Sequence, residues 1–213
     1  MALVSHLDLV RLFDRVVRRA SLPISFTGGF HPGPRISIAN ALSLGATSSS
    51  EIVDFELTER VDLSDFRNRL ELALPNDLPV YHVEEIDLDT LAATRLLDRA
   101  EYLITVETSE PASLSQWQTW LDQVNNTQEV PWDKITKSGN INRVNLRDRL
   151  FSLSLETQTP QETDRVILRY IGRCRNDGTL LQPEQVVYML QQVTENEFHL
   201  IHTHRQQLIL SVG

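Results

Sequence analysis

Residues 51–57 read Glu-Ile-Val-Asp-Phe-Glu-Leu, so polar and apolar side chains are interleaved along this segment. An alternation with a period of two is typical of a β-strand that lays one face against a core. Residues 35–39 read Arg-Ile-Ser-Ile-Ala and alternate in the same way. The two segments predict two strands, and the rest of the first half of the chain can be assigned around them.

Helices and shorter strands are predicted on either side. Apolar residues recur at helical spacing from Leu9 to Ala20 and from Leu63 to Leu74, and Ser5-His-Leu-Asp8 is a capping-box pattern at the start of the first helix. Along residues 1–87 the predicted elements are a remnant strand at 2–4, a helix, strands at 24–26, 35–39 and 51–57, a helix, and a strand at 79–83. This order of elements is the split βαβ plan of a ferredoxin-like half.

A second half of similar plan follows a helical connector at residues 88–99. Residues 100–108 alternate as a strand, residues 114–124 have helical spacing with Ser113 as the cap, and Pro183 suits the first turn of another helix. The predicted fold class is therefore α+β, with two tandem ferredoxin-like halves, antiparallel sheets and helices packed on one face. The second half spans residues 100–213, with further strands at 129–136, 150–155 and 165–174, one or two strands at 198–210, and one extra hairpin.

Composition excludes several classes of function. The chain has 20 basic and 29 acidic side chains, and its net charge of −9 is too acidic for a general nucleic-acid coat. With a single cysteine, Cys174, it has no internal disulfide, four-thiolate zinc site or three-cysteine iron–sulfur cradle. The sequence contains neither an apolar run long enough for a membrane span nor a signal peptide, so the expected location is cytoplasmic.

The charge is unevenly distributed along the chain. It is +3 over residues 1–50, −13 over residues 51–130 and +1 over residues 131–213. If the two basic segments share a face, they form a surface for a polyanion on a protein that is acidic overall. The alternative is ordinary solvated surface.

The strongest local feature is the loop Thr-Gly-Gly-Phe-His-Pro-Gly-Pro-Arg at residues 27–35. Its adjacent glycines allow backbone conformations closed to other residues, and its prolines stiffen the turn. In a functional interpretation the arginine anchors an anion or a carboxylate, the histidine forms hydrogen bonds and the phenylalanine stacks. In a structural interpretation the phenylalanine is in the core and the arginine pairs with an acid. The candidate binding residues of this loop are Gly28, Gly29, Phe30, His31 and Arg35.

The predicted first helix carries further candidates. His6 and Asp8 are placed to position a substrate, although Asp8 also fits the first helical turn as a cap. Arg11 and the three arginines after it form a basic face that would grip phosphates. Pairs between Asp8 and Arg11 and between Asp14 and Arg18 would instead make half of this face an ordinary solvated one.

A basic hairpin in the second half is the other candidate anion site. It consists of Lys137 in a Lys-Ser-Gly-Asn segment, followed by Arg143 and Arg147. His202 and His204 point the same way if their segment is a strand, but two imidazoles without a third ligand at a fixed spacing are a weak metal signature.

Ser5-His-Leu-Asp-Leu9 and Gly29-Phe-His-Pro-Gly-Pro-Arg-Ile-Ser37 resemble a bacterial family of domains of unknown function linked to radical S-adenosylmethionine (SAM) proteins. The resemblance implies that the domain is the C-terminal part of a radical SAM polypeptide or a separate chain encoded beside one. It also implies a longer first strand than Met1–Val4, so we expect a fragment of a fusion protein or a late start site. The family often has Asn at the position of His31, which favours hydrogen bonding over proton transfer.

Three functions are therefore considered. The first is a non-catalytic accessory module that binds a radical SAM partner or its substrate through residues 28–35 and the adjacent basic surface. No cofactor is then expected in this chain, because SAM and an iron–sulfur cluster would lie in the partner or a fused domain. The first alternative is an RNA-binding or RNA-processing module. The second alternative is an independent hydrolase or transferase that uses His31 or His6 as a base.

Overall fold

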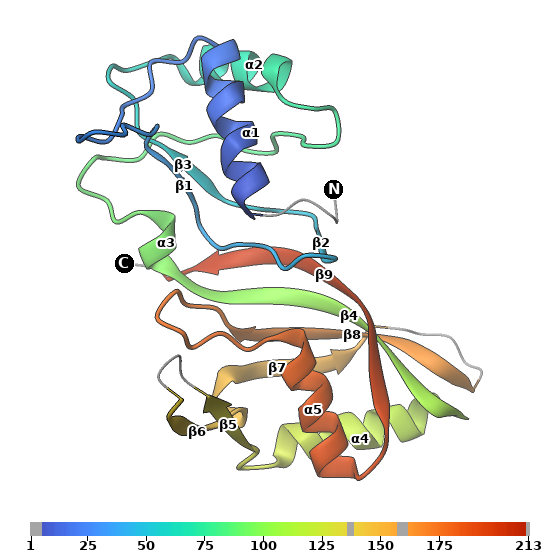
Figure 1. Cartoon of the computed structure of the whole chain (residues 1–213). Helices are drawn as coiled ribbons and strands as arrows, with labels where there is room; N and C mark the ends of the chain where they lie inside the picture. The colour runs from blue at the N-terminus through green and yellow to red at the C-terminus, as the bar shows by residue number, and fades with distance from the viewer. Residues whose placement is uncertain (1–5, 136–138, 157–161, 212–213) are drawn as a thin grey trace. The chain divides into compact units, whose positions relative to one another are not determined.

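The computed structural model of the chain describes residues 6–135, 139–156 and 162–211 (Figure 1). The chain forms two compact units. The first contains the residues up to Leu44 together with Glu51–Leu96, and the second contains Gly45–Ser50 together with the residues from Leu97 onward. The short segment Gly45–Ser50 thus belongs to the second unit, although it interrupts the sequence of the first.

The second unit contains a ferredoxin-like sheet. Its strands lie in the order β9-β4-β8-β7, and each of these neighbouring pairs is antiparallel. The helices α4 and α5 pack against each other and cover one face of the sheet (Figure 1). This is the split βαβ arrangement, because the first and third strands of the unit lie side by side at the centre. In chain order the elements are β4 (Leu97–Ala112), α4 (Leu114–Asn126), β7 (Leu150–Leu155), β8 (Thr163–Arg173), α5 (Pro183–Thr194) and β9 (Phe198–Leu210).

Two additions extend this plan. The strand β2 (Thr47–Ser48) pairs in parallel with β9 at the edge of the sheet. The strands β5 (Pro131–Ile135) and β6 (Ile141–Asn145) form a separate antiparallel hairpin between α4 and β7, which confirms the extra hairpin expected from the sequence. A single turn of 3₁₀-helix, η1 (Arg147–Arg149), leads from this hairpin into β7.

The covered face of the sheet follows from the alternation in the sequence. Every second residue of β4 from Ala100 to Val106 is buried, and in β8 the rings of Tyr170 and its neighbour Tyr102 stack with centroids 5.0 Å apart. Burial of one large apolar side chain contributes roughly 1.5–3 kcal/mol, so the buried side chains of this face stabilise the unit. The buried helix side chains that cover it include Trp117, Leu121 and Val124 of α4 and Val186, Met189 and Leu190 of α5.

The helices of the second unit begin as the sequence predicts. The Ser113 side chain accepts a hydrogen bond from the Gln116 backbone N–H and caps α4. Pro183 stands in the first turn of α5, where its missing N–H costs nothing. Gln182 and Gln185 complete a reciprocal capping box at the same helix start.

In the described part of the chain, the first unit contains three helices and a two-stranded antiparallel sheet. The rings of Phe13, Phe55 and Phe66 form consecutive edge-to-face contacts at 5.9 and 5.7 Å, which join α1, β3 and α2. Asp62 caps α2 by accepting hydrogen bonds from the backbone N–H groups of Ser64 and Asp65. The elements are α1 (His6–Arg19), β1 (Ile36–Ile38), β3 (Val53–Phe55), α2 (Leu63–Ala73) and α3 (Ala93–Leu96).

Several predicted elements of this unit differ from the structure. Residues 24–26 form only isolated bridges, and residues 79–83 form no strand; instead the side chains of Val80 and Val83 pack against the helix core. The helix predicted over the connector covers only Ala93–Leu96, because Leu97 is already buried as the first residue of β4. The strand predicted at residues 2–4 and the Ser5 cap lie outside the described residues.

The predicted α+β class, with antiparallel sheets and helices packed on one face, is confirmed. Within the described ranges, no helix is long and apolar enough to cross a membrane.

Candidate functional site

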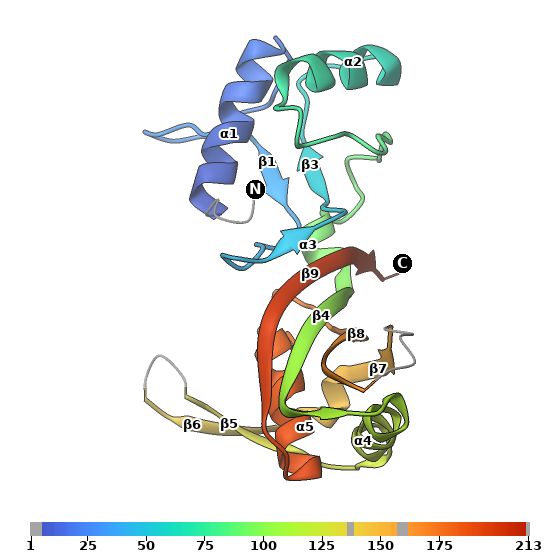
Figure 2. The same ribbon diagram turned by 90° about the vertical axis from the view of Figure 1, so that its right-hand side faces the viewer.

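The loop at residues 27–35 is closed at its neck by hydrogen bonds. The Thr27 backbone N–H donates to the Gly33 carbonyl at 2.9 Å, and the Gly33 N–H donates to the Thr27 hydroxyl at 3.0 Å. Below this neck, the Arg35 N–H donates to the Ser25 carbonyl at 2.8 Å. Five residues, 28–32, are left to form a tip with fixed ends, and in Figure 2 this blue loop projects beside α1.

The tip of the loop is fully open to solvent. Phe30 is as exposed as in an extended peptide, at 102 %, and His31 is also exposed. The interpretation that places Phe30 in the core is therefore wrong. Gly29 has a φ of +106°, which explains a glycine there, and a side chain added at Gly28 or Gly29 would meet no atom within 4 Å.

Arg35 lies at the base of the loop and pairs with Glu56, with 3.0 Å between Nη1 and Oε2. Both side chains are about half exposed, so this pair is a weak one and the guanidinium remains accessible.

His6 and His31 are exposed, and among the described residues no carboxylate orients either ring. A partner that orients the ring is a common feature of a histidine base, so its absence here leaves the hydrolase alternative without support from the geometry.

The basic face of α1 is largely paired. Arg11 lies 3.7 Å from Asp8, and Arg18 lies 3.0 Å from Asp14, as the helical spacing predicts. The Arg18 guanidinium also lies 5.5 Å from the ring centre of Phe26. Arg11 remains mostly exposed, and it is accessible to an anion only in competition with Asp8.

The candidate residues of the basic hairpin belong to the second unit, and those that the structure describes have different contacts. Lys137 lies outside the described residues. Arg143 makes a two-pronged contact with Asp133 across the hairpin, at 2.8 and 3.2 Å. This contact raises the pKa of Arg143 and lowers that of Asp133, in both cases chiefly through the hydrogen bond between them.

Arg147 is engaged by backbone carbonyls within the second unit. Its guanidinium donates to the Leu150 carbonyl at 2.7 Å and to the Asn125 carbonyl at 2.9 Å. It thereby satisfies a carbonyl at the end of α4, which has no partner within the helix. We therefore leave Arg147 out of the proposed sites.

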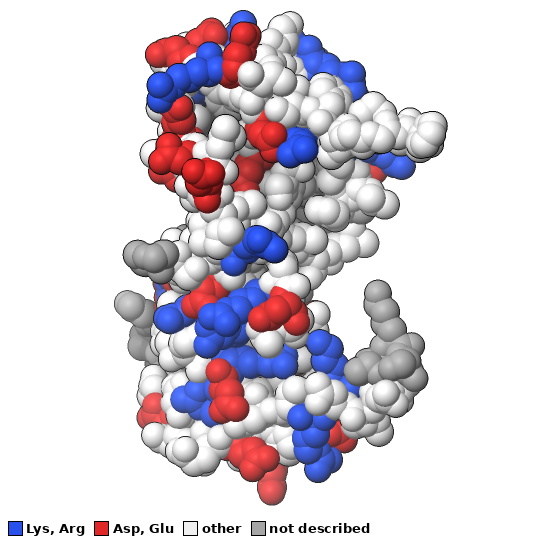
Figure 3. Space-filling view, turned by 90° about the vertical axis from the view of Figure 1, so that its left-hand side faces the viewer, with Lys and Arg blue, Asp and Glu red and all other residues white. Residues whose placement is uncertain are grey.

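A row of arginines that the sequence analysis missed lies on the open face of the second sheet. Arg165, Arg169 and Arg173 alternate with buried residues of β8, and Arg175 follows the end of the strand. Side chains two residues apart in a strand share a face. The spacing of these arginines within residues 165–175 was therefore the sequence signal that could have predicted a row of arginines on one face. Figure 3 shows Lys and Arg intermixed with Asp and Glu on the second unit, in the lower part of the view.

Two of these arginines are balanced by carboxylates. Arg165 pairs with Glu107, its direct partner in the β4–β8 register. Arg169 contacts Glu156, at 2.9 and 3.0 Å, and also Glu101. These hydrogen bonds, that of Glu156 first, raise the pKa of Arg169, and the same contact lowers the pKa of Glu156. The arginine is therefore cationic, and its group carries one net negative charge.

Three arginines share a single carboxylate at the other end of the row. Arg173 and Arg175 each approach Asp98 Oδ1 to 2.6 Å, and Arg99 Nε lies 3.0 Å from Oδ2. We call these four residues the Asp98 cluster. Burial alone would raise the pKa of Asp98, but the hydrogen bonds from Arg175, Arg173 and Arg99 outweigh it and lower the pKa. With one ionised carboxylate and three guanidinium groups, the cluster carries a charge of +2.

Phe151 lies against the same cluster because of a β-bulge. The β7–β8 register shifts between Leu150 and Ser152, so one extra residue is accommodated in β7. As a result Phe151 and Ser152 are both exposed, whereas Leu150 and Leu153 are buried on the covered face. The Phe151 ring centre lies 4.0 Å from the Arg99 guanidinium carbon and 4.7 Å from that of Arg173.

His202 and His204 do face the same way, towards β2. The Thr47 hydroxyl lies 3.0 Å from His202 Nε2 and 2.8 Å from His204 Nδ1, and the Ser49 hydroxyl lies 2.7 Å from His204 Nε2. Burial first, and His202 second, lower the pKa of His204. Both imidazoles are thus engaged by hydroxyls, and the described part of the chain contains no group of three or more metal-ligating side chains.

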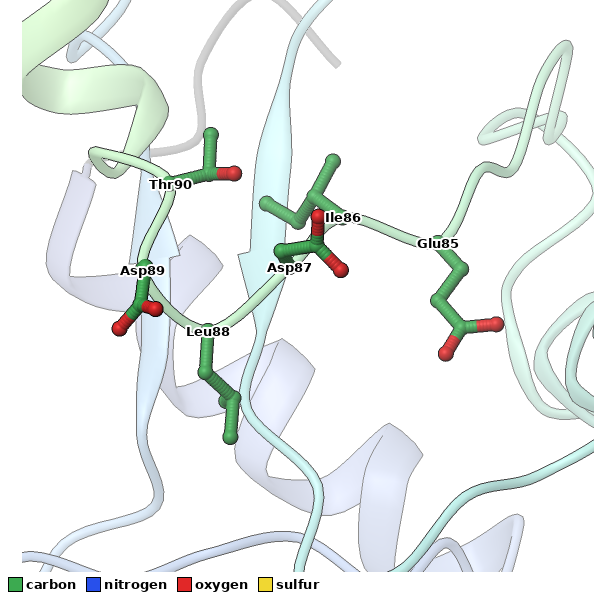
Figure 4. A pocket seen from close by; sticks show the side chains of 6 residues that line it. All are labelled: Glu85, Ile86, Asp87, Leu88, Asp89 and Thr90. Atoms are coloured by element: carbon green, nitrogen blue, oxygen red, sulfur yellow. The ribbon is translucent and has the colours of Figure 1, made fainter.

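A shallow depression in the first unit is lined by six consecutive residues, Glu85–Thr90 (Figure 4). The carboxylates of Glu85, Asp87 and Asp89 point in different directions and do not converge on one point. Hence this depression does not have the geometry of a ligand site.

The fold and the accessible surfaces define a ferredoxin-like α+β protein with an exposed loop at residues 27–35 and an open, arginine-bearing sheet. Residues 1–183 match the model of a family described as "Uncharacterized protein conserved in bacteria (DUF2344)". The chain belongs to that family. A comparison with curated proteins finds no match.

Solved structures share the fold at very low sequence identity. One chain of a Cbf5–Nop10–Gar1 complex aligns with a TM-score of 0.54 and 7% identity over 97% of this chain. A chain of the archaeal box H/ACA sRNP Nop10–Cbf5 complex gives 0.51 and 8%, and one of an H/ACA RNP bound to a substrate RNA containing 2′-deoxyuridine gives 0.50 and 8%, each over 97% of this chain. This protein spans only 46%, 44% and 44% of those chains, respectively.

Proposed function

We propose that this protein is a non-catalytic accessory module that binds a radical SAM enzyme, or the substrate of that enzyme, through the loop at residues 28–35. The observation that carries the proposal is the complete exposure of Phe30 at the tip of a loop with a closed neck. An exposed aromatic ring is unfavourable in water, and burial against a partner recovers that free energy. The stiff loop loses little conformational entropy on binding.

Charged groups of the first unit support recognition of a polar partner surface. Arg35 at the base of the loop is about half exposed and Arg11 on α1 is mostly exposed, and among the described residues each is paired with a single carboxylate. Exposed pairs of this kind contribute about 0–1 kcal/mol, so either arginine can exchange its carboxylate for one from a partner. The SAM and the iron–sulfur cluster would belong to the partner, since the one cysteine here is the buried Cys174.

Phe30→Ala is expected to weaken binding to the neighbouring or fused radical SAM protein about 30-fold, because a central aromatic anchor contributes about 2 kcal/mol. Calorimetric titration of the two purified proteins measures this effect. Leu72→Ala is the matched control, because Leu72 is an apolar residue of α2 that is 87 % exposed in the same unit. Equal dissociation constants for the two variants, or no complex with the wild type, would contradict the proposal.

RNA binding is the second candidate function. The observation that favours it is the Asp98 cluster, whose three arginines lie at one end of the open face of the sheet in the second unit, since cationic side chains on an open sheet face suit a single strand. One of the structures named above is described as an H/ACA RNP bound to a substrate RNA, but at 8% identity it contributes only the fold to this proposal.

The affinity of the protein for a ten-nucleotide oligouridine should fall as the salt concentration rises. Two phosphate contacts predict a slope of about −1.4 for log K against log salt, because each contact on a single strand contributes about −0.7. Fluorescence anisotropy at a series of KCl concentrations measures the slope. No detectable binding at low salt, or binding that does not depend on salt, would remove this candidate.

A further inference from the structure

On the open face of the five-stranded sheet in the second unit, the net charge differs from one group of arginines to the next. Arg165 and Glu107 form a neutral pair, and Arg169 with its two carboxylates has a net charge of −1. Of the three groups that these described arginines form, the Asp98 cluster alone has an excess of positive charge, and the formal charge of its four residues is +2. The carboxylate of Asp177 acts on Arg175 from outside the cluster and reduces this excess. An anion on this face is therefore attracted to the end of the row that contains Asp98.

The guanidinium groups of the cluster are held in place before any ligand binds. Asp98 is buried, and it receives one or two hydrogen bonds from each of Arg99, Arg173 and Arg175. Each guanidinium has five N–H donors, so Asp98 occupies only a minority of them. Arg99 and Arg173 are also direct partners in the β4–β8 register, which fixes the distance between their backbones.

Phe151 restricts the same side chains from a third strand. Its ring lies within cation–π distance of Arg99 and Arg173. Exposed arginines normally lose side-chain entropy when they bind a ligand, and this contact removes part of that cost in advance. The side chains remain partly accessible, with 43 % of Arg99, 24 % of Arg173 and 47 % of Arg175 exposed.

We infer that the Asp98 cluster is a binding site for the phosphodiester backbone of single-stranded RNA, with Phe151 as a positioning residue. The inference deepens the second candidate function and rests on it. Guanidinium groups bind phosphate through paired, charge-assisted hydrogen bonds, and three groups around one carboxylate leave charge for one or two phosphates. The negatively charged group around Arg169 keeps the strand from running along β8, so contact is limited to this end.

The test compares two variants that differ in where charge is removed. Arg99→Gln/Arg175→Gln removes the two more exposed arginines and leaves Arg173 to neutralise Asp98. Arg165→Gln is the control, because it removes an arginine of the same sheet face whose charge is already balanced by Glu107. Thermal unfolding of each variant verifies that the fold is intact.

The double variant is expected to bind oligouridine at least about ten-fold more weakly, and its salt slope should fall from about −1.4 towards zero. Arg165→Gln should bind as the wild type does. Phe151→Leu should weaken binding with the salt slope unchanged, since it removes positioning and no charge.

Each other outcome identifies what fails. If wild-type protein does not bind oligouridine, the RNA function itself is wrong. If it binds but the double variant behaves like Arg165→Gln, RNA binds elsewhere and the inferred site is wrong. If inorganic phosphate at an equal phosphate concentration displaces the oligouridine completely, the cluster is a site for free phosphate and the inferred polynucleotide ligand is wrong.

Discussion

Trp117→Ala should lower the free energy of unfolding of the second unit by about 4 kcal/mol, because the loss of a buried tryptophan leaves a large cavity. Trp117 is 0 % exposed. Its ring centre lies 5.2 Å from that of Trp120 and 5.6 Å from that of Phe198. These contacts join α4 to the start of β9, so the cavity would open between the helix layer and the sheet. Urea unfolding followed by circular dichroism measures the loss.

Two further variants calibrate this result. Trp117→Phe keeps most of the apolar volume and should cost clearly less than the alanine variant. Gln118→Ala changes an exposed side chain on the same helix and should stay within about 0.5 kcal/mol of the wild type. A loss below about 1 kcal/mol for Trp117→Ala would show that this side chain does not fill the core between helix and sheet.

Asp98→Asn is expected to cost about 2–3 kcal/mol at pH 7. Loss of one partner of a buried ion pair costs about 3–5 kcal/mol, and the partial exposure of the three arginines reduces that figure. The asparagine fits the same space, so the effect reports the lost charge. Three guanidinium groups would then lie close together with no anion between them.

The effect of this substitution should depend on pH in a definite direction. The pKa of Asp98 is lower in the folded protein than its ordinary value, so its contribution to stability is fully present above a pH of about 4. That contribution is lost as the pH falls through the folded-state pKa. Urea unfolding at pH 7 and pH 3 should therefore show a smaller difference between wild type and Asp98→Asn at the lower pH.

Asp133→Asn provides the comparison for this experiment. Asp133 also pairs with an arginine, but it lies on the exposed β5–β6 hairpin, where the ion pair is solvated. Its substitution should change stability little at either pH. A large loss for Asp133→Asn, or a pH-independent loss for Asp98→Asn, would contradict the assignment of the stabilising charge to the Asp98 cluster.

The helices and the long strands could be predicted because their signals are local. Ser113, Asp62 and Pro183 mark helix starts through hydrogen bonds and backbone angles that involve neighbouring residues only. The strand at residues 79–83 was predicted on the same kind of pattern and is absent. Val80 and Val83 satisfy the alternation by packing against helices, and no strand pairs with them.

Of the two candidate sites, one could be predicted from local sequence and the other could not. The exposed loop was recognisable because glycine and proline act on the local backbone, although exposure of Phe30 was one of two open interpretations. The Asp98 cluster was not recognisable, because it depends on register. Arg99 and Arg173 meet only after β4 and β8 pair, and Phe151 reaches them only because β7 contains a bulge. Neither the register nor the bulge has a signature in the sequence of one strand.

Because β2 belongs to the second unit, dividing the chain at any single residue cannot yield both units complete. Its residues precede most of the first unit in the sequence, yet Ser48 and Ser49 donate hydrogen bonds to the Arg205 carbonyl at the rim of the second sheet. A polypeptide started at Leu97 would lack this strand and leave the outer side of β9 without its partner, and such bare edges invite association between molecules. A truncated or fused form of this chain therefore has to keep residues 45–50 together with the second unit.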